Sequence, residues 1–282
     1  MFVTALLGLL PGLALLFPGA VLALVTLQRG PRIGAIVAVG AAVLLAVPSL
    51  WSPERTLVQG LLYSAWLLGP PLVLAVVLGR SQSLSLCLQV AVLLGIAAIV
   101  LLHSSLGDPV VFWEPFRREF EQTMQEHAVP RTPELEALLD TLGRRLWGWV
   151  AAQVLLLTLC AVFLGRKWQG SEGQPGAFGA EFRALRLGLA LGAVAAVFIG
   201  LSIWLDNTLI DEIAIVFSAA LLLIGLAAAH RFRAQSGLHV IWLWVIYIGL
   251  VVVMPLMVAV LATWGFVDNW LRSRPAAIAS RA

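Results

Sequence analysis

The chain is poor in charged residues and in cysteine. Only 12% of its 282 residues are Asp, Glu, Lys or Arg, against about 25% in an average soluble protein. Hydrophobic residues make up 61% of the chain, and the mean hydropathy is +0.97. This composition excludes a soluble globular enzyme and a disordered chain. The two cysteines, Cys87 and Cys160, both lie in apolar stretches, so a disulfide scaffold is excluded as well.

The usual catalytic and metal-binding motifs are also missing. There is no HExxH, no Walker lysine loop, no nucleophile elbow and no Cys/His cluster with metal spacing. We therefore expect no enzyme, no cofactor and no metal site. The net charge of +3 comes with arginines in short loops between apolar runs. Membrane topology explains such loops, so we expect no nucleic-acid partner.

Long runs without any charged residue divide the chain. Each is long enough, or nearly so, to cross a hydrocarbon core about 30 Å thick as an α-helix. The runs are apolar on every face, whereas strands of a membrane barrel alternate. We predict an all-α integral membrane protein, a polytopic bundle of about eight transmembrane helices surrounded by the lipid bilayer. The runs cover residues 2–28, 33–53, 56–79, 81–107, 146–165, 187–205, 213–229 and 234–267.

This pattern predicts four parts of the chain. Residues 1–105 hold the first four transmembrane helices. Residues 106–145 form a large loop. Residues 146–267 hold the last four transmembrane helices, with a flexible linker at 166–182, and residues 268–282 form a C-terminal tail.

Basic and acidic loops alternate along the chain, which predicts the topology. Arginines such as Arg29 and Arg80 lie in one set of loops, and most acids lie in the other set. The positive-inside rule places the arginine loops in the cytoplasm and the 106–145 loop outside. Eight spans would then put the arginines of the C-terminal tail outside, against the rule. A hairpin within 234–267, or a first run that does not cross, would change this, and both alternatives stay open.

The outer loop is predicted to hold two amphipathic helices. Phe112, Phe116 and Phe120 recur every four residues, and Thr132-Pro133-Glu134 is typical of a helix start. Leucines follow at helical spacing. One interpretation is that both helices lie in the membrane interface and cover the ends of the bundle. The other is a lid or a docking surface for a partner.

The candidate ligand-binding residues belong to the predicted outer side. Trp204 lies at the end of the sixth run, and Asp206 and Asn207 lie between the sixth and seventh runs. Tyr63 and Trp66, in the third run, are expected on the same side. They would bind a cationic or polar solute. The alternative is a solvated loop with an aromatic belt.

Ionisable residues within the runs are scarce. His103 and His239, near run ends, are interpreted as interfacial, and we found no other ionisable residue inside a run. Because buried ionisable groups mark ion pathways in membrane proteins, this scarcity argues against an ion pump.

Small residues at every fourth position predict close helix packing. One series lies in the second run, and another lies in the sixth. Such ridges let helix backbones approach closely. They indicate packing inside the bundle or, alternatively, docking of another membrane subunit. The residues are Gly34, Ala38 and Ala42, and Gly188, Gly192, Ala196 and Gly200.

Four segments carry a family resemblance. They are Val25–Gly30, Leu106–Val110, Leu185–Gly188 and the closing Gly265-Phe266-Val267-Asp268-Asn269-Trp270, followed by Arg274. Together they resemble the YybS-like family of bacterial membrane proteins, a domain of unknown function. The closing pattern of Gly265, Asp268, Trp270 and Arg274 is its most specific part.

The resemblance implies a fold similar to the substrate-binding (S) components of energy-coupling-factor transporters, and a bacterial inner membrane. Those components capture a vitamin from the outer side and dock on a separate energising module. We therefore expect a solute-binding or transport-associated subunit with a small-molecule solute and an energising or other membrane subunit as partners. The alternative is a non-transporting membrane scaffold or assembly factor acting through the outer amphipathic loop.

Overall fold

The computed structural model describes residues 2–51, 56–127, 130–171 and 176–273. Within these residues the chain is all-helical, and five helices are long and apolar enough to cross a membrane. The chain is thus a multi-pass helical membrane protein. The five are α3 (Leu57–Ser81), α4 (Leu84–Leu106), α7 (Leu146–Ser171), α10 (Thr208–Ser236) and α12 (Met254–Ser273).

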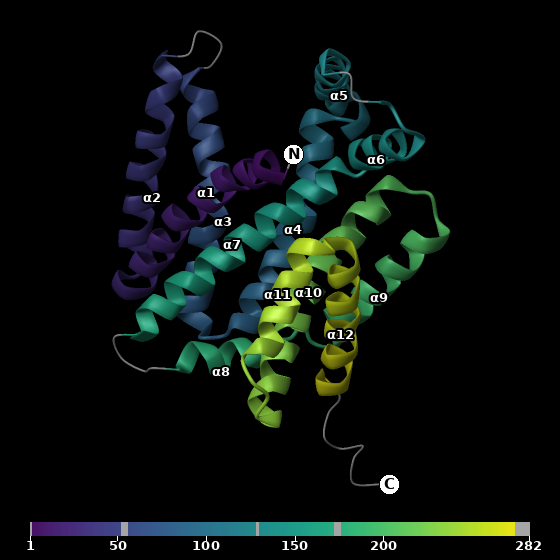
Figure 1. The fold of residues 1–282 in the computed structure, drawn as a ribbon. Helices are drawn as coiled ribbons and strands as arrows, with labels where there is room; N and C mark the ends of the chain where they lie inside the picture. Colours follow the sequence, from purple (N-terminus) through teal and green to yellow (C-terminus); the bar gives the residue numbers. More distant parts are fainter. Residues whose placement is uncertain (1, 52–55, 128–129, 172–175, 274–282) are drawn as a thin grey trace. The chain divides into compact units, whose positions relative to one another are not determined.

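Shorter apolar helices accompany these five. They comprise the Leu16–Arg29 part of α1 (Phe2–Arg29), α2 (Pro31–Ala46), α9 (Leu189–Trp204) and α11 (Ile241–Val252). A short 3-10 helix, η1 (Val47–Trp51), follows α2. Figure 1 shows the helices in chain order, from purple to yellow.

The chain forms two compact units that are interleaved in sequence. Because the segments alternate, α4, α7, α10 and α11 each contribute one end to each unit. Unit 1 comprises Met1–Ala91, Leu156–Leu187 and Leu226–Gly249, and unit 2 comprises Val92–Leu155, Gly188–Gly225 and Leu250–Ala282.

In unit 1, helices α1, α2 and α3 pack on one another through small residues. A Cβ added at Gly34 would lie 2.9 Å from the Cβ of Thr26, so only glycine fits there without a shift. Ala38 is buried with Leu22 and Leu68. Ala42 borders the same cluster. The small residues of α2 therefore let α1 and α3 approach its backbone.

The segment 166–182 is helical at both ends, where the sequence predicted a flexible linker. Helix α7 continues to Ser171, and α8 covers Ala177–Arg183. The physical reason is the Arg166 side chain, which donates to Glu181 over 2.7 and 3.1 Å and to Gln82 over 3.1 Å. This corrects the linker prediction for the described residues, and 172–175 lie outside them.

The last apolar run contains two separate helices. Helix α11 ends at Val252 and α12 begins at Met254, so this run holds two helices instead of one continuous span. Pro255, the second residue of α12, has no N–H and suits the first turn of a helix. Helix α12 continues to Ser273, so the predicted C-terminal tail begins as helix.

Helices α10 and α12 cross with their backbones in contact in unit 2. A Cβ added at Gly225 would meet the backbone of Leu261, and one at Gly265 would meet the carbonyl of Leu221. Two glycines, one on each helix, therefore set this crossing.

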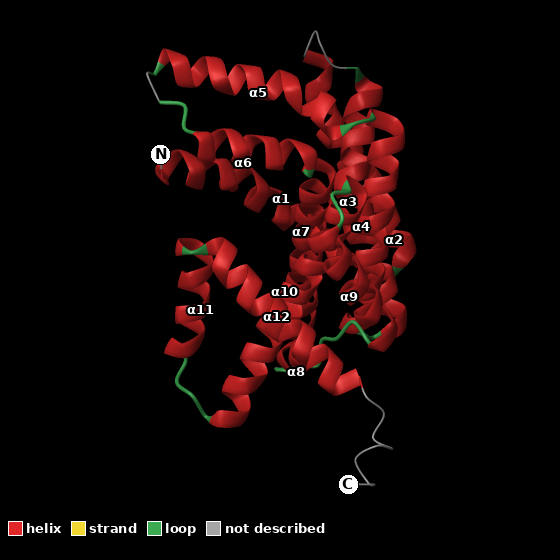
Figure 2. Ribbon diagram, turned by 90° about the vertical axis from the view of Figure 1, so that its right-hand side faces the viewer, coloured by secondary structure: helices red, strands yellow, loops and turns green. Residues whose placement is uncertain are grey.

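The two predicted helices of the large loop are confirmed as α5 (Pro109–Glu126) and α6 (Pro133–Arg144). The Asp108 carboxylate accepts from the N–H of Val110, and the Thr132 hydroxyl accepts from the N–H of Leu135. The two helices lie side by side and run across the end of α4 rather than along it (Figure 2).

Candidate functional site

The most unusual polar contacts in unit 2 lie where α6 ends and α7 begins. We call residues Arg144–Trp147 the α6–α7 junction. The Arg145 guanidinium donates to Oδ2 of Asp211, with both its Nε and its Nη2 at 2.8 Å. The Asp211 side chain is 10% exposed, and its Oδ1 has no hydrogen-bond partner in the part of the chain that the structure describes. The junction therefore holds the first turn of α10.

Glu212 lies next to Asp211 and is fully buried. Its Oε2 is 2.6 Å from Nε2 of His103, in the last turn of α4. Its Oε1 accepts from the backbone N–H of Trp147 over 3.1 Å. The first N–H groups of a helix have no intrahelical partner and carry partial positive charge, so the Glu212 carboxylate satisfies the start of α7.

Gly148 makes this approach sterically feasible. A Cβ at position 148 would lie 2.7 Å from the Cα of Glu212. The first turns of α7 and α10 are therefore in direct backbone contact. A larger residue at position 148 would push the buried carboxylate away from the N–H of Trp147.

Trp147 joins the same site to α4 and α5. Its indole N–H donates to the carbonyl of Gly107 over 3.1 Å, and its ring centroid lies 4.9 Å from that of Phe112. Trp147 is 2% exposed. One residue thus binds Glu212 through its backbone and anchors the start of α5 through its side chain.

A hollow of about 420 Å³ lies between α5 and α6. Arg117 is fixed there by ion pairs with Glu121 and Asp140, and the hydrogen bond to Glu121, with that to Asp140, raises the pKa of Arg117 above its ordinary value. The indole N–H of Trp113 is buried and unpaired within the described residues. The hollow is lined by Val110, Trp113, Glu114, Arg117, Asp140, Gly143 and Arg144.

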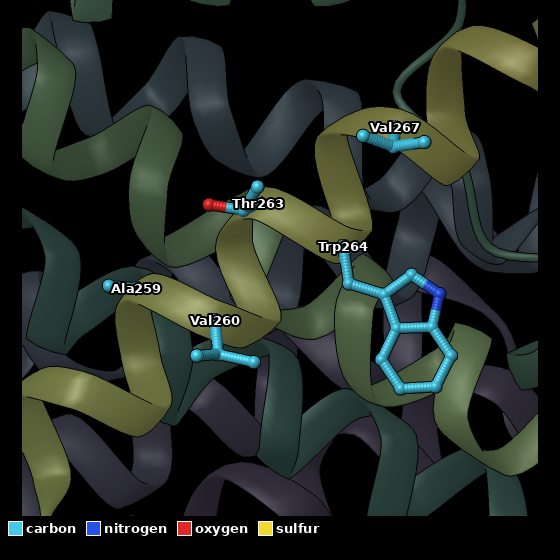
Figure 3. Close-up of a pocket in the computed structure, with 5 residues that line it drawn as sticks. All are labelled: Ala259, Val260, Thr263, Trp264 and Val267. Carbon is cyan, nitrogen blue, oxygen red and sulfur yellow. The ribbon is translucent and has the colours of Figure 1, made fainter.

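A second hollow, of about 570 Å³, lies on α12 and has a different character. All five of its lining residues come from α12, and Thr263 supplies the sole hydroxyl among them. Figure 3 shows Val260, Thr263 and Trp264 along this single helix. Because few polar groups converge there, it suits an acyl chain or a helix better than a polar solute.

Three predicted ligand-binding residues lie at the connection from α9 to α10: Trp204 is the last residue of α9, and Asp206 and Asn207 follow it. Trp204 is 85% exposed. The Asp206 side chain is 94% exposed and lies 3.7 Å from Arg144. The Asn207 Oδ1 accepts from the N–H of Ile210 over 3.2 Å, which makes Asn207 a cap of α10.

The other two predicted ligand-binding residues lie in unit 1. Tyr63 and Trp66 are both on α3, and Tyr63 is 60% exposed. Neither of the hollows described above includes them.

Three of the four residues of the closing sequence pattern lie on α12. Gly265 forms the crossing with α10, Asp268 lies 3.6 Å from Arg272, and Trp270 stacks on Phe266. Arg274 lies outside the described residues. The three described residues of the pattern thus share one helix, α12, but not one face of it.

The small residues of α9 take different places. Gly188 precedes the helix with a φ of 82°, where glycine is favoured. Gly192 is buried against Asn269, Ala196 is half-buried, and a Cβ at Gly200 would meet nothing within 4 Å. Ala195 is fully buried instead. The packed face of α9 therefore follows Gly192 and Ala195.

Sequence reasoning missed the Glu212–His103 pair. Asp211 and Glu212 fall between the sixth and seventh charge-free runs of the sequence, but α10 begins at Thr208 and includes both. His103 was interpreted as interfacial, yet it binds a buried carboxylate. The available signal was two acids directly before an apolar run, which is the preferred place for acids in a first helical turn.

Comparison of the chain with protein-family models, with curated proteins and with solved structures found no significant match. The site is therefore interpreted from its geometry.

Proposed function

We propose that this chain is a solute-binding or transport-associated subunit of the bacterial inner membrane, with its solute in the hollow between α5 and α6. The observation that carries the proposal is the link between this hollow and the buried Glu212–His103 pair. Arg144 lines the hollow, Arg145 binds Asp211, and the N–H of Trp147 binds Glu212. Arg144, Arg145 and Trp147 all lie within one short stretch of chain.

The chemistry of the hollow favours a small polar solute. Its volume of about 420 Å³ falls within the range of about 300–1,000 Å³ that small-molecule sites occupy. The unpaired indole N–H of Trp113 is available to a solute acceptor. Arg144, whose side chain is 53% exposed, is available to an anionic group. A solute held there would act on the junction and so on the hydrogen bonds of Glu212.

The proposed topology has nine crossings, in place of the eight predicted from charge-free runs. It adds to the five long helices the four shorter apolar ones, which are 12 to 16 residues long: α2, α9, α11 and the Leu16–Arg29 part of α1. Asn269, near the end of α12, hydrogen-bonds Gly188 at the start of α9. Since the arginines just before Gly188 favour the cytoplasm, the end of α12 would lie there too. Nine crossings thus bring the C-terminal arginines into agreement with the positive-inside rule.

A solute-binding subunit of this kind needs an energising partner, since the sequence has no nucleotide-binding loop. This part of the proposal rests on the resemblance to YybS-like proteins and to S components. The scaffold alternative is favoured by one observation, the exposure of Phe116 and Phe120 on α5.

Native mass spectrometry of gently solubilised protein, purified without added ligand, tests the proposal. We expect a stoichiometric small molecule or a co-purified ATPase module. A bound molecule should be lost from Trp113→Phe and Arg144→Gln, and kept by Arg118→Gln, whose side chain is 72% exposed. If the wild-type chain carries only lipid, or a non-ATPase membrane protein, the solute-binding proposal is overturned in favour of the scaffold.

A further inference from the structure

Three phenylalanines of α5 form an exposed row. We call Phe112, Phe116 and Phe120 the aromatic stripe, and their exposed fractions are 38%, 52% and 46%. They are four residues apart and so lie on one side of the helix. Soluble surfaces rarely leave a contiguous row of large aromatic rings uncovered. Something outside the described chain must therefore cover the stripe.

The stripe continues into a membrane-spanning helix. Phe112 contacts Phe116 at a ring distance of 5.8 Å and Trp147 at 4.9 Å, and Trp147 is the second residue of α7. Two residues separate the end of α4 from α5, and one residue separates α6 from α7. Both ends of the loop are therefore held at the ends of spans, which is the level of the lipid headgroups.

The direction of α5 suits the plane of a membrane. Helices α5 and α6 run across the end of α4 (Figure 2), and α4 is a candidate span. An amphipathic helix that crosses the end of a span lies parallel to the bilayer surface. The opposite side of α5 carries the ion pair Glu114–Arg118, which would face water.

The net charge of residues 108–145 indicates which lipid headgroups suit the aromatic stripe. Residues 108–145 contain eight carboxylates and five arginines, a net charge of −3. This segment has no specific attraction to anionic headgroups, because such attraction needs clustered basic residues. The stripe thus fits a neutral or zwitterionic surface, held by burial of aromatic rings.

We propose that α5 lies in the membrane–water interface on the outer side of the bilayer, with the aromatic stripe inserted among lipid headgroups and upper acyl chains. Lipid is favoured over a protein partner because the stripe is continuous with Trp147, so whatever covers it must reach bilayer level. The inference concerns the lipid contact of this chain and does not depend on a solute.

Collision accessibility of nitroxide labels tests this inference. Single-cysteine variants are made in a background with Cys87→Ala and Cys160→Ala, and the protein is placed in phosphatidylcholine nanodiscs. Phe116→Cys and Phe120→Cys probe the stripe, and Arg118→Cys and Gln122→Cys are the matched controls on the same helix. Size-exclusion profiles and melting curves select the variants that fold. Two stripe positions are labelled, so either one can test the inference if the other variant does not fold.

We expect the two stripe labels to collide more with apolar oxygen than with a water-soluble nickel complex, and the two control labels to show the reverse. Nanodiscs that contain anionic phosphatidylglycerol should give the same pattern. Nickel accessibility at all four positions would overturn the inference and place α5 in water. Exclusion of both reagents from the stripe positions would also overturn it, and would point to a covering protein.

Discussion

Asn269 forms hydrogen bonds with both main-chain groups of Gly188. Its Nδ2 donates to the Gly188 carbonyl over 3.0 Å, and its Oδ1 accepts from the Gly188 N–H over 3.1 Å. Asn269 is 1% exposed. A buried amide that satisfies the backbone of a positive-φ glycine fixes how α12 meets the start of α9.

Replacing Asn269 with alanine should destabilise the protein by about 1–3 kcal/mol. The change leaves the N–H and the carbonyl of Gly188 without these partners, and an unsatisfied buried polar group costs about that much. Thermal unfolding in detergent measures the effect. Thr263→Ala, at an exposed position of the same helix, should leave the melting temperature nearly unchanged. Equal melting temperatures for Asn269→Ala and wild type would contradict the prediction.

Gly265→Ala should lower stability, whereas Gly200→Ala should not. A Cβ at Gly265 would meet the backbone carbonyl of Leu221, which cannot move without shifting α10. A Cβ at Gly200 would meet nothing within 4 Å. Alanine is favoured over glycine in a helix by about 0.5–1 kcal/mol, so Gly200→Ala should be neutral or stabilising. Melting curves of the two variants, purified in parallel, measure the difference. Similar decreases of the melting temperature in both would show that the predicted α9 ridge is packed at Gly200.

His103→Ala should lower the free energy of unfolding more than the double change of His103→Ala with Glu212→Gln does. The single change leaves the Glu212 carboxylate buried without the His103 imidazole, and breaking a buried pair in this way costs about 3–5 kcal/mol. The second change removes the charge and should recover part of that loss. A double-mutant cycle with chemical unfolding measures the coupling.

Glu119→Gln is the matched control for that cycle, because Glu119 is exposed on α5. It should show no coupling with His103→Ala. Additive effects of His103→Ala and Glu212→Gln would mean that the 2.6 Å contact contributes little to stability.

The C-terminus should lie in the cytoplasm. In a variant without Cys87 and Cys160, we expect Ser280→Cys to resist a membrane-impermeant maleimide in intact cells and to react after lysis. Gln122→Cys, on the opposite side in the proposed topology, should react in intact cells. Labelling of both positions before lysis would exclude the nine-crossing arrangement.

Local features of this fold were predictable, and contacts between distant residues were not. The start of α6 follows from Thr132 and Pro133, because caps and N1 prolines act within one turn. The Glu212–His103 contact joins residues 109 positions apart, and no spacing rule reports such a pair. The same holds for α9, where periodicity identified small residues but not which of them would meet Asn269.

The length of α7 also escaped prediction for a physical reason. Polar residues after Arg166 predict a flexible segment, because nothing local favours helix there. The partner that stabilises the helical end, Glu181, belongs to a different helix. Its effect became visible only with the structure.

The hydrogen bonds between Gly188 and Asn269 also constrain biosynthesis. The two residues are 81 positions apart, and at about 5–20 residues per second a ribosome needs roughly 4–16 s to make that stretch. During this delay the start of α9 is already synthesised while its partner has not yet been translated. Slow codons or a truncation before residue 269 would lengthen the delay or make it permanent, and would expose the nascent protein to membrane quality-control proteases.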